Sequence, residues 1–162
     1  MIILGIDPGL ATIGYGIIEK NKNGLNKKPV FVCLDYGLIE TSSSQEKTQR
    51  LKKINNELSK LIKKHKPDVM AMETVYFFKN FKTAIPVSQA GGVILLTAAK
   101  NNLPVFSFTP LQVKMAVTGF GRAEKKDVQK NIIKTLKLKS LPRTDDIADA
   151  LAVALTYFIK EI

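Results

Sequence analysis

Residues 2–19 read IILGIDPGLATIGYGIIE, and this stretch decides the fold. An apolar run ends at Asp7, and Pro8-Gly9, a pair that favours a turn, follows at once. Residues 12–19 form a second run that predicts another strand. Strands joined by so short a connection pair antiparallel, because a parallel pair needs a crossover of roughly a dozen residues or more. Asp7 is thereby placed at the end of a strand, beside a turn.

The sheet extends outward from these two strands. Residues 30–40 (VFVCLDYGLIE) predict a third strand, and three strands with short connections form an antiparallel meander. Residues 42–66 then switch to helical period, with apolar residues three and four positions apart between Leu51 and Ile62. Residues 68–73 (DVMAME) predict a buried strand. A helical crossover at this point makes the sheet partly parallel.

The rest of the chain alternates between helix and strand. Residues 83–101 predict a helix rich in small side chains, which suits an internal packing seam or a dimer seam. Residues 104–108 predict a fifth strand, and Thr109-Pro110 is an N-cap followed by proline that starts a short helix. Two more helices are expected, over about residues 123–137 and from Thr144 to the end. The fold class is therefore α/β, with a mixed five-stranded sheet flanked by helices.

Length and composition restrict the number of domains and the cellular environment. The 162 residues fit a single domain over residues 1–162, and the 45% apolar content excludes a disordered chain. One cysteine, Cys33, cannot form an internal disulfide. No apolar run approaches the roughly 18–20 residues that span a bilayer, and the N-terminus lacks the basic region of a signal peptide. We expect a cytoplasmic protein.

The charge is strongly positive and unevenly distributed. The chain has 25 Lys and Arg against 14 Asp and Glu, a net charge of +11. Such an excess favours a polyanionic partner, because Lys and Arg release counterions from phosphates, although a solvated Lys-rich surface gives the same count. No Asp or Glu occurs between Thr74 and Ala123, a stretch that carries Lys79, Lys82, Lys100, Lys114 and Arg122. We interpret this stretch as a candidate binding face.

Acidic residues occur at two predicted strand ends and at the start of the last helix. Asp7 and Glu73 each follow an apolar run, and strand ends are where α/β sheets form ligand sites. On the last helix, Asp149 shares a face with both Asp146 and Asp145, so spacing does not choose between the two. Aspartates in the first turn also favour a helix start, and a capping role is the plainer interpretation for Asp145.

These acids suggest a metal centre. Carboxylates without His or Cys select Mg²⁺ or Mn²⁺ over Zn²⁺. Two such ions about 3.5–4 Å apart activate a water molecule and stabilise the leaving oxygen of a phosphodiester displacement. A basic surface that holds nucleic acid around such a centre is what a nuclease needs. The residues alone favour a metal-dependent nuclease.

Motifs along almost the whole chain then point to one family. GIDPGLATIGYGII, METVYFFKN, SQAGGV, TPLQVKMAVTGFGRAEKKDVQ and DDIADALAVALTY follow one another from residue 1 to about residue 158. Together they resemble the RuvC family of Holliday-junction resolvases. The resemblance implies a ribonuclease-H-like fold and a homodimer that resolves four-way DNA junctions, in homologous recombination and DNA repair, by paired symmetric nicks. It also implies a branch-migration helicase complex as a partner.

The resemblance assigns roles to individual residues. The family's four-acid site, which would hold two Mg²⁺ ions with Mn²⁺ as a substitute, maps onto Asp7, Glu73, Asp146 and Asp149. That mapping selects Asp146 over Asp145. The aromatic that stacks on an unpaired junction base maps onto Tyr76, and Phe77 beside it either stacks or fills the core. The expected DNA-binding set is Tyr76, Phe77, Lys79, Lys82, Lys114, Arg122 and Lys125.

Other functions remain open from the sequence. An ATP-dependent phosphotransferase shares the early Asp-x-Gly turn, but it needs two related domains. A ribonuclease-H-like nuclease that acts on RNA–DNA hybrids or on another nucleic-acid structure is a second alternative, but it would have no use for the aromatic residues at 76–78. A junction-binding protein that does not cut would require misplaced acids. We also interpret His65 as a solvated residue of a Lys-rich helix end, and the helix around Gly91 and Gly92 as the candidate dimer seam.

Overall fold

A computed structural model describes residues 1–21, 29–74, 81–140 and 144–160, and for residues 81–83 it describes the helical backbone alone. The predicted elements are present, with ends that move by a few residues. They are β1 (Ile2–Asp7), β2 (Thr12–Asn21), β3 (Val30–Glu40), α1 (Lys47–His65), β4 (Val69–Glu73), α2 (Phe81–Lys100), β5 (Val105–Phe108), α3 (Pro110–Thr118), α4 (Lys125–Leu136) and α5 (Asp145–Lys160).

The five strands form one mixed sheet in the order β3-β2-β1-β4-β5, as the sequence predicts. β1, β2 and β3 pair antiparallel, whereas β4 pairs parallel with both β1 and β5. In the register of β1 and β4, Ile6 lies opposite Met72. The next residues, Asp7 and Glu73, therefore end neighbouring strands at the same edge of the sheet.

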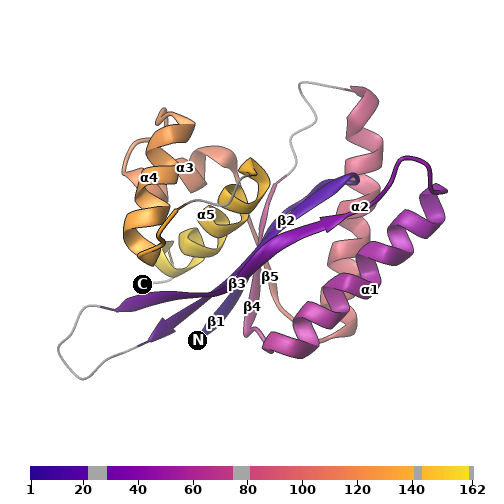
Figure 1. The fold of residues 1–162 in the computed structure, drawn as a ribbon, viewed down its shortest axis with the longest axis horizontal. Helices are drawn as coiled ribbons and strands as arrows, with labels where there is room; N and C mark the ends of the chain where they lie inside the picture. The colour runs from indigo at the N-terminus through magenta and orange to yellow at the C-terminus, as the bar shows by residue number, and fades with distance from the viewer. Residues whose placement is uncertain (22–28, 75–80, 141–143, 161–162) are drawn as a thin grey trace.

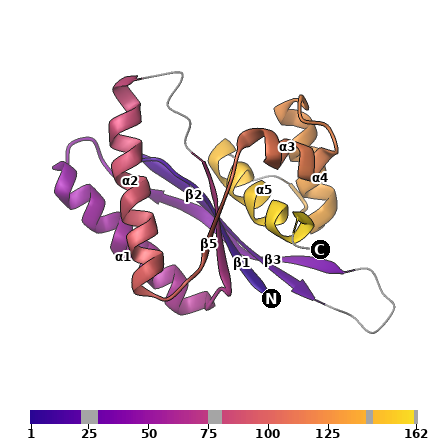
Figure 2. The same ribbon diagram turned by 180° about the vertical axis from the view of Figure 1, so that it is seen from behind.

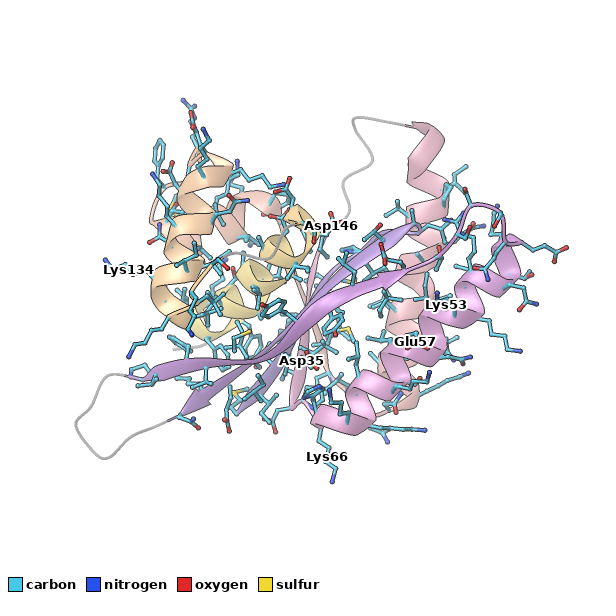
Figure 3. The ribbon with its side chains drawn as sticks, viewed as in Figure 1. Asp35, Lys53, Glu57, Lys66, Lys134 and Asp146 are labelled. Carbon is cyan, nitrogen blue, oxygen red and sulfur yellow. The ribbon has the colours of Figure 1, made fainter. Side chains whose placement is uncertain are left out.

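Helices cover both faces of the sheet. α1 and α2 lie on one face, and α3, α4 and α5 lie on the other (Figures 1 and 2). Each face has its own apolar core: Ile54 and Ile94 pack with the sheet on the first, and Ile132 and Phe158 on the second. In Figure 3, Asp146 at the start of α5 and Lys53 on α1 lie on opposite sides of the sheet. Within the described ranges, no helix is long and apolar enough to cross a membrane.

α5 is packed directly against the sheet, and glycines in the strands permit this close approach. A Cβ on Gly5 would collide with the backbone oxygen of Ala150, and a Cβ on Gly14 would collide with that of Asp146. The residues from Ala150 to Phe158 are buried, as expected of a helix enclosed by other elements. The close packing fixes the height of the first turn of α5 above the ends of β1 and β2.

Candidate active site

The four predicted acids come together where β1 and β4 end and α5 begins. Asp7 is the last residue of β1, Glu73 is the last residue of β4, and Asp146 and Asp149 lie in the first turns of α5. Burial, followed by the charges of Glu73, Asp149 and Asp146, raises the pKa of Asp7 from 3.8 to about 8. Asp7 is therefore the carboxyl group around which the cluster is built.

The other carboxyl groups respond to the same surroundings. Burial, followed by the charge of Asp149, raises the pKa of Glu73 to about 7, and Lys125 and Lys114 oppose that rise. Burial also raises the pKa of Asp149, which Lys125 again opposes. Perturbed carboxyl groups that face one another across the end of a sheet are typical of functional sites.

Lys125 is the cation within this cluster. Its Nζ lies 3.1 Å from Oδ2 of Asp145 and 3.5 Å from Oδ2 of Asp149. Burial alone would lower the pKa of Lys125, but the contacts with these two aspartates outweigh it and the pKa is raised. Lys125 is the first residue of α4, so its ammonium group links the start of α4 to the start of α5.

Asp145 lies in the first turn of α5, where the sequence suggests a capping role, and it also contacts α4. It is the first residue of α5, and its carboxylate points towards α4. Besides the contact with Lys125, Oδ1 of Asp145 accepts a hydrogen bond of 3.2 Å from Nε2 of Gln129. Asp145 therefore holds the two helices together beside the site.

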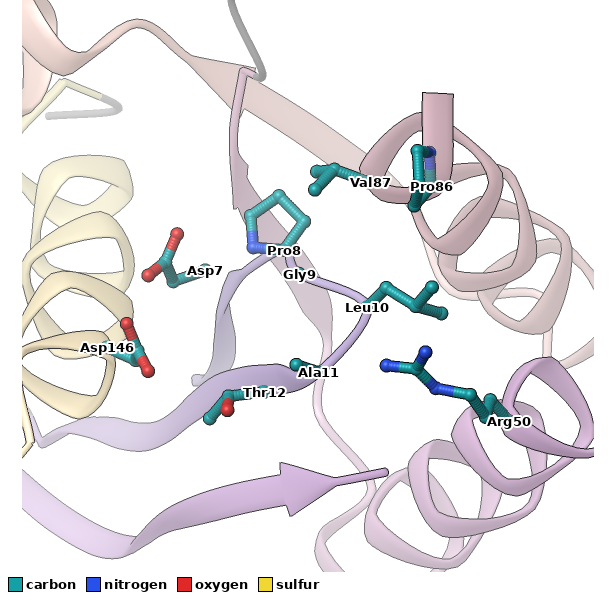
Figure 4. A pocket seen from close by; sticks show the side chains of 10 residues that line it. All are labelled: Asp7, Pro8, Gly9, Leu10, Ala11, Thr12, Arg50, Pro86, Val87 and Asp146. Carbon is teal, nitrogen blue, oxygen red and sulfur yellow. The ribbon is translucent and has the colours of Figure 1, made fainter. Parts of the chain in front are cut away.

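Two pockets adjoin the acids. One, of about 480 Å³, extends from Asp7 and Asp146 along residues 8–12 to Arg50 on α1, with Pro86 and Val87 of α2 at its side (Figure 4). The other, of about 290 Å³, is lined by polar groups of both signs and by apolar residues, namely Glu73, Pro110, Val113, Lys114, Lys125, Val128 and Asp149. The acid cluster thus opens on both sides to space that also has a basic residue in its wall.

The donor set suits a hard divalent cation. The acids provide only carboxylate oxygens, the ligands that Mg²⁺ prefers, and a cation would offset both the burial and the repulsion that raise the pKa of Asp7. In the described part of the chain, no three His, Cys, Asp or Glu side chains are close enough to hold one ion. The cluster fits such an ion by its donor chemistry and by the strand ends and helix start that converge on it.

The residues predicted to contact DNA lie in different places in the structure. Lys114 and Lys125 line the smaller pocket beside Glu73. Arg122 is exposed in the connection between α3 and α4, and it is not part of the lining of either pocket. Tyr76, Phe77 and Lys79 lie outside the described residues, as does the side chain of Lys82.

The structure gives His65 and Arg50 surroundings that the sequence did not predict. His65 is not a solvated helix end: its Nε2 lies 2.9 Å from Oδ2 of Asp35, and its side chain is 12% exposed. The same Asp35 oxygen accepts a hydrogen bond of 3.0 Å from Nζ of Lys64. Arg50, which lines the larger pocket, has no sequence signal beyond its place at the start of a basic helix.

Comparisons with known proteins agree with this geometry. The family model described as crossover junction endodeoxyribonuclease RuvC matches residues 3–157. A crossover junction endodeoxyribonuclease RuvC from Caldicellulosiruptor saccharolyticus is 50% identical over 160 residues, covering 99% of this chain and 93% of the relative.

Solved structures give the same result. The Thermus thermophilus RuvC structure superposes with a TM-score of 0.90 at 30% identity, and that of T. thermophilus RuvC in complex with a Holliday junction substrate with a TM-score of 0.88 at 27% identity. Each comparison covers 99% of this chain and 95% of the other. RuvC structures have a ribonuclease-H-like fold, so the expected fold class is confirmed.

Proposed function

Because the chain belongs to the RuvC family of crossover junction endodeoxyribonucleases, we propose that it cuts four-way DNA junctions at the acid cluster where β1 and β4 end. This activity resolves Holliday junctions in homologous recombination and DNA repair. The observation that carries the assignment of the site is the convergence of Glu73, Asp146 and Asp149 on the buried Asp7, because three carboxylates that raise the pKa of a fourth need a cation for all four to be charged together.

Nucleases of this family depend on a divalent metal. Asp7, Glu73, Asp146 and Asp149 would hold two Mg²⁺ ions, with Mn²⁺ as a substitute. When bound, such ions activate the attacking water and stabilise the leaving oxygen. The protein's own contribution is placement: the strand ends hold Asp7 and Glu73, and the packing of α5 on Gly14 and Gly5 holds the other two acids.

Basic groups at the site would bind the DNA backbone. Lys114 and Lys125 are close enough to the acids to lower the pKa of Glu73, so their charges are available to a phosphate beside the cluster. The T. thermophilus complex contains a Holliday junction substrate, which supports junction DNA as the ligand. Base stacking is assigned to Tyr76 from the family resemblance and to its neighbour Phe77 as an aromatic beside it. Phosphate binding by Lys79, Lys82 and Arg122 is assigned from the stretch between Thr74 and Ala123 that lacks Asp and Glu.

Paired nicks require two active sites, and α2 has a surface suited to a homodimer. Ile85, Leu95 and Leu96 are 66%, 44% and 53% exposed. Gly91 and Gly92 on the same helix have open space where a Cβ would stand, so a second backbone could approach there. A two-fold dimer through α2 would place one acid cluster on each of two strands. We assign the branch-migration helicase partner and the cytoplasmic location from the family, and treat residues 1–162 as a single domain.

The site assignment is tested by separating binding from cutting. The wild type and Asp7→Asn are mixed with a labelled four-way junction, in EDTA for binding and in Mg²⁺ for cleavage. Asp7→Asn should bind the junction at least as tightly as the wild type and leave it uncut. Glu40→Gln, which removes an exposed carboxylate at the end of β3, is the matched control and should cut normally. Full activity of Asp7→Asn would refute the assignment.

A further inference from the structure

Arg50 connects α1 to the turn that follows Asp7. Its Nε donates a hydrogen bond of 2.9 Å to Oγ1 of Thr41, and that hydroxyl donates one of 2.6 Å to the carbonyl oxygen of Leu10. The backbone N–H of Thr41 also donates to the carbonyl oxygen of Ala11, at 2.8 Å. Thr41 is buried, so these bonds fix both the guanidinium group and residues 10–11.

Within the described part of the chain, the charge of Arg50 has no partner of opposite charge. Among the described residues, no carboxylate forms an ion pair with Arg50, and its terminal amino groups donate to no protein atom. The side chain is half-buried and lines the pocket of about 480 Å³, with its guanidinium directed at the turn of Leu10 and Ala11 (Figure 4). A half-buried cation without a counterion is costly unless a ligand neutralises it.

The position of this cation relative to the acids identifies the ligand. Asp7 and Asp146 lie at one end of the pocket and Arg50 lies at the other, with residues 8–12 between them (Figure 4). When one phosphate of a DNA strand lies at the acid cluster, the neighbouring phosphates of that strand must lie along an adjoining surface. A guanidinium fixed through Nε keeps both terminal amino groups free for two-point hydrogen bonding to phosphate oxygens.

We propose that Arg50 binds a backbone phosphate of the cleaved strand, close to the phosphate that is cut, and so holds that strand in register with the acids. This inference rests on the proposed nuclease function. Arg50 is a positioning residue, since its contact is with a neighbouring phosphate and not with the reacting atoms. A purely structural brace between α1 and the turn needs the Nε bond alone and does not require the unpaired charge.

The first experiment measures the salt dependence of junction binding in EDTA, where the strand stays intact. Each phosphate contact contributes about 0.9 to the slope of log affinity against log salt concentration. Arg50→Gln should therefore lower the slope by about 0.9. Lys53→Gln, which removes an exposed charge of α1 outside the pocket lining, should leave the slope unchanged. Thr41→Val removes the supporting hydroxyl but keeps the charge, so it should also retain the wild-type slope.

A second experiment locates the phosphate and remains informative if Arg50→Gln folds poorly, because Arg50→Lys can take its place. Phosphates flanking the cut are replaced one at a time by neutral methylphosphonates. At one position the wild type should lose affinity, Arg50→Gln should be indifferent, and Arg50→Lys should respond weakly. A wild-type slope in Arg50→Gln, together with equal sensitivity at every position, would overturn the inference. A wild type that does not bind the junction would instead refute the proposed function.

Discussion

Replacing Asp7 by asparagine should abolish cleavage and yet stabilise the metal-free protein. In the folded state, burial and the charges of Glu73, Asp149 and Asp146 raise the pKa of Asp7 from 3.8 to about 8. At neutral pH the folded protein therefore keeps this carboxyl group protonated, whereas the unfolded chain ionises it. Folding at pH 7 carries a cost that asparagine, which is neutral and of similar shape, avoids.

The magnitude follows from the two pKa values of Asp7. Between 3.8 and pH 7 lie about 3 pH units, each worth about 1.4 kcal/mol, so asparagine should stabilise the metal-free protein at pH 7 by at most about 4 kcal/mol. The raised pKa means that the folded state binds more protons than the unfolded state. The penalty is therefore absent below pH 4, grows with rising pH, and is complete above about pH 8.

Urea denaturation in EDTA at pH 5, 7 and 9 measures this effect. The stability gap between Asp7→Asn and the wild type should widen as the pH rises, and Glu40→Gln should remain within about 0.5 kcal/mol of the wild type. Mg²⁺ should then stabilise the wild type more than Asp7→Asn, because binding to the folded state alone raises stability. If Asp7→Asn is equal to or less stable than the wild type at every pH, burial and the neighbouring acids do not raise the pKa of Asp7 in the folded protein.

Three further variants test the framework around the acids. Gly14→Ala pushes a Cβ into the backbone oxygen of Asp146 and should destabilise the protein by about 3 kcal/mol in urea; an unchanged midpoint would contradict the close packing of α5. Lys125→Gln removes a cation that opposes the rise in the pKa of Asp149, so the pH midpoint of single-turnover cleavage should move upward, and a downward shift would refute this role. Leu96→Glu should give a monomer by light scattering and unpaired nicks; an intact dimer would exclude this face of α2.

The strands and the two acids at strand ends, Asp7 and Glu73, could be predicted because their signals are local. The apolar run of residues 2–6 ends at a turn pair, and residues 69–72 repeat the pattern before Glu73. The crossover helix between the runs implies that β1 and β4 are parallel, and parallel neighbours bring their carboxyl ends to the same edge. Spacing alone left Asp145 and Asp146 equivalent, and the family resemblance separated them.

The remaining features depend on contacts between distant segments. The sequence places Asp145 at the start of a helix, but it does not predict the contacts of Asp145 with Gln129 and Lys125 of α4. Arg50 is one basic residue among many in a Lys-rich helix, and only its contact with Thr41, which in turn bonds to Leu10, marks it out. The packing of α4 on α5, and of α1 on the turn after β1, has no signature in the local sequence. Both contacts depend on how the helices pack on the sheet.

Cleavage of one strand sequence in three substrates tests the proposed function: a four-way junction, a linear DNA duplex and an RNA–DNA hybrid. With Mg²⁺, the wild type should nick the junction at symmetric positions on two opposing strands and leave the other two substrates largely intact. EDTA should stop cutting, and added Mg²⁺ should restore it. Equal cleavage of the linear duplex, preferential cleavage of the hybrid, or cutting in EDTA would contradict the assignment of the acid cluster as the metal-dependent centre of a junction resolvase.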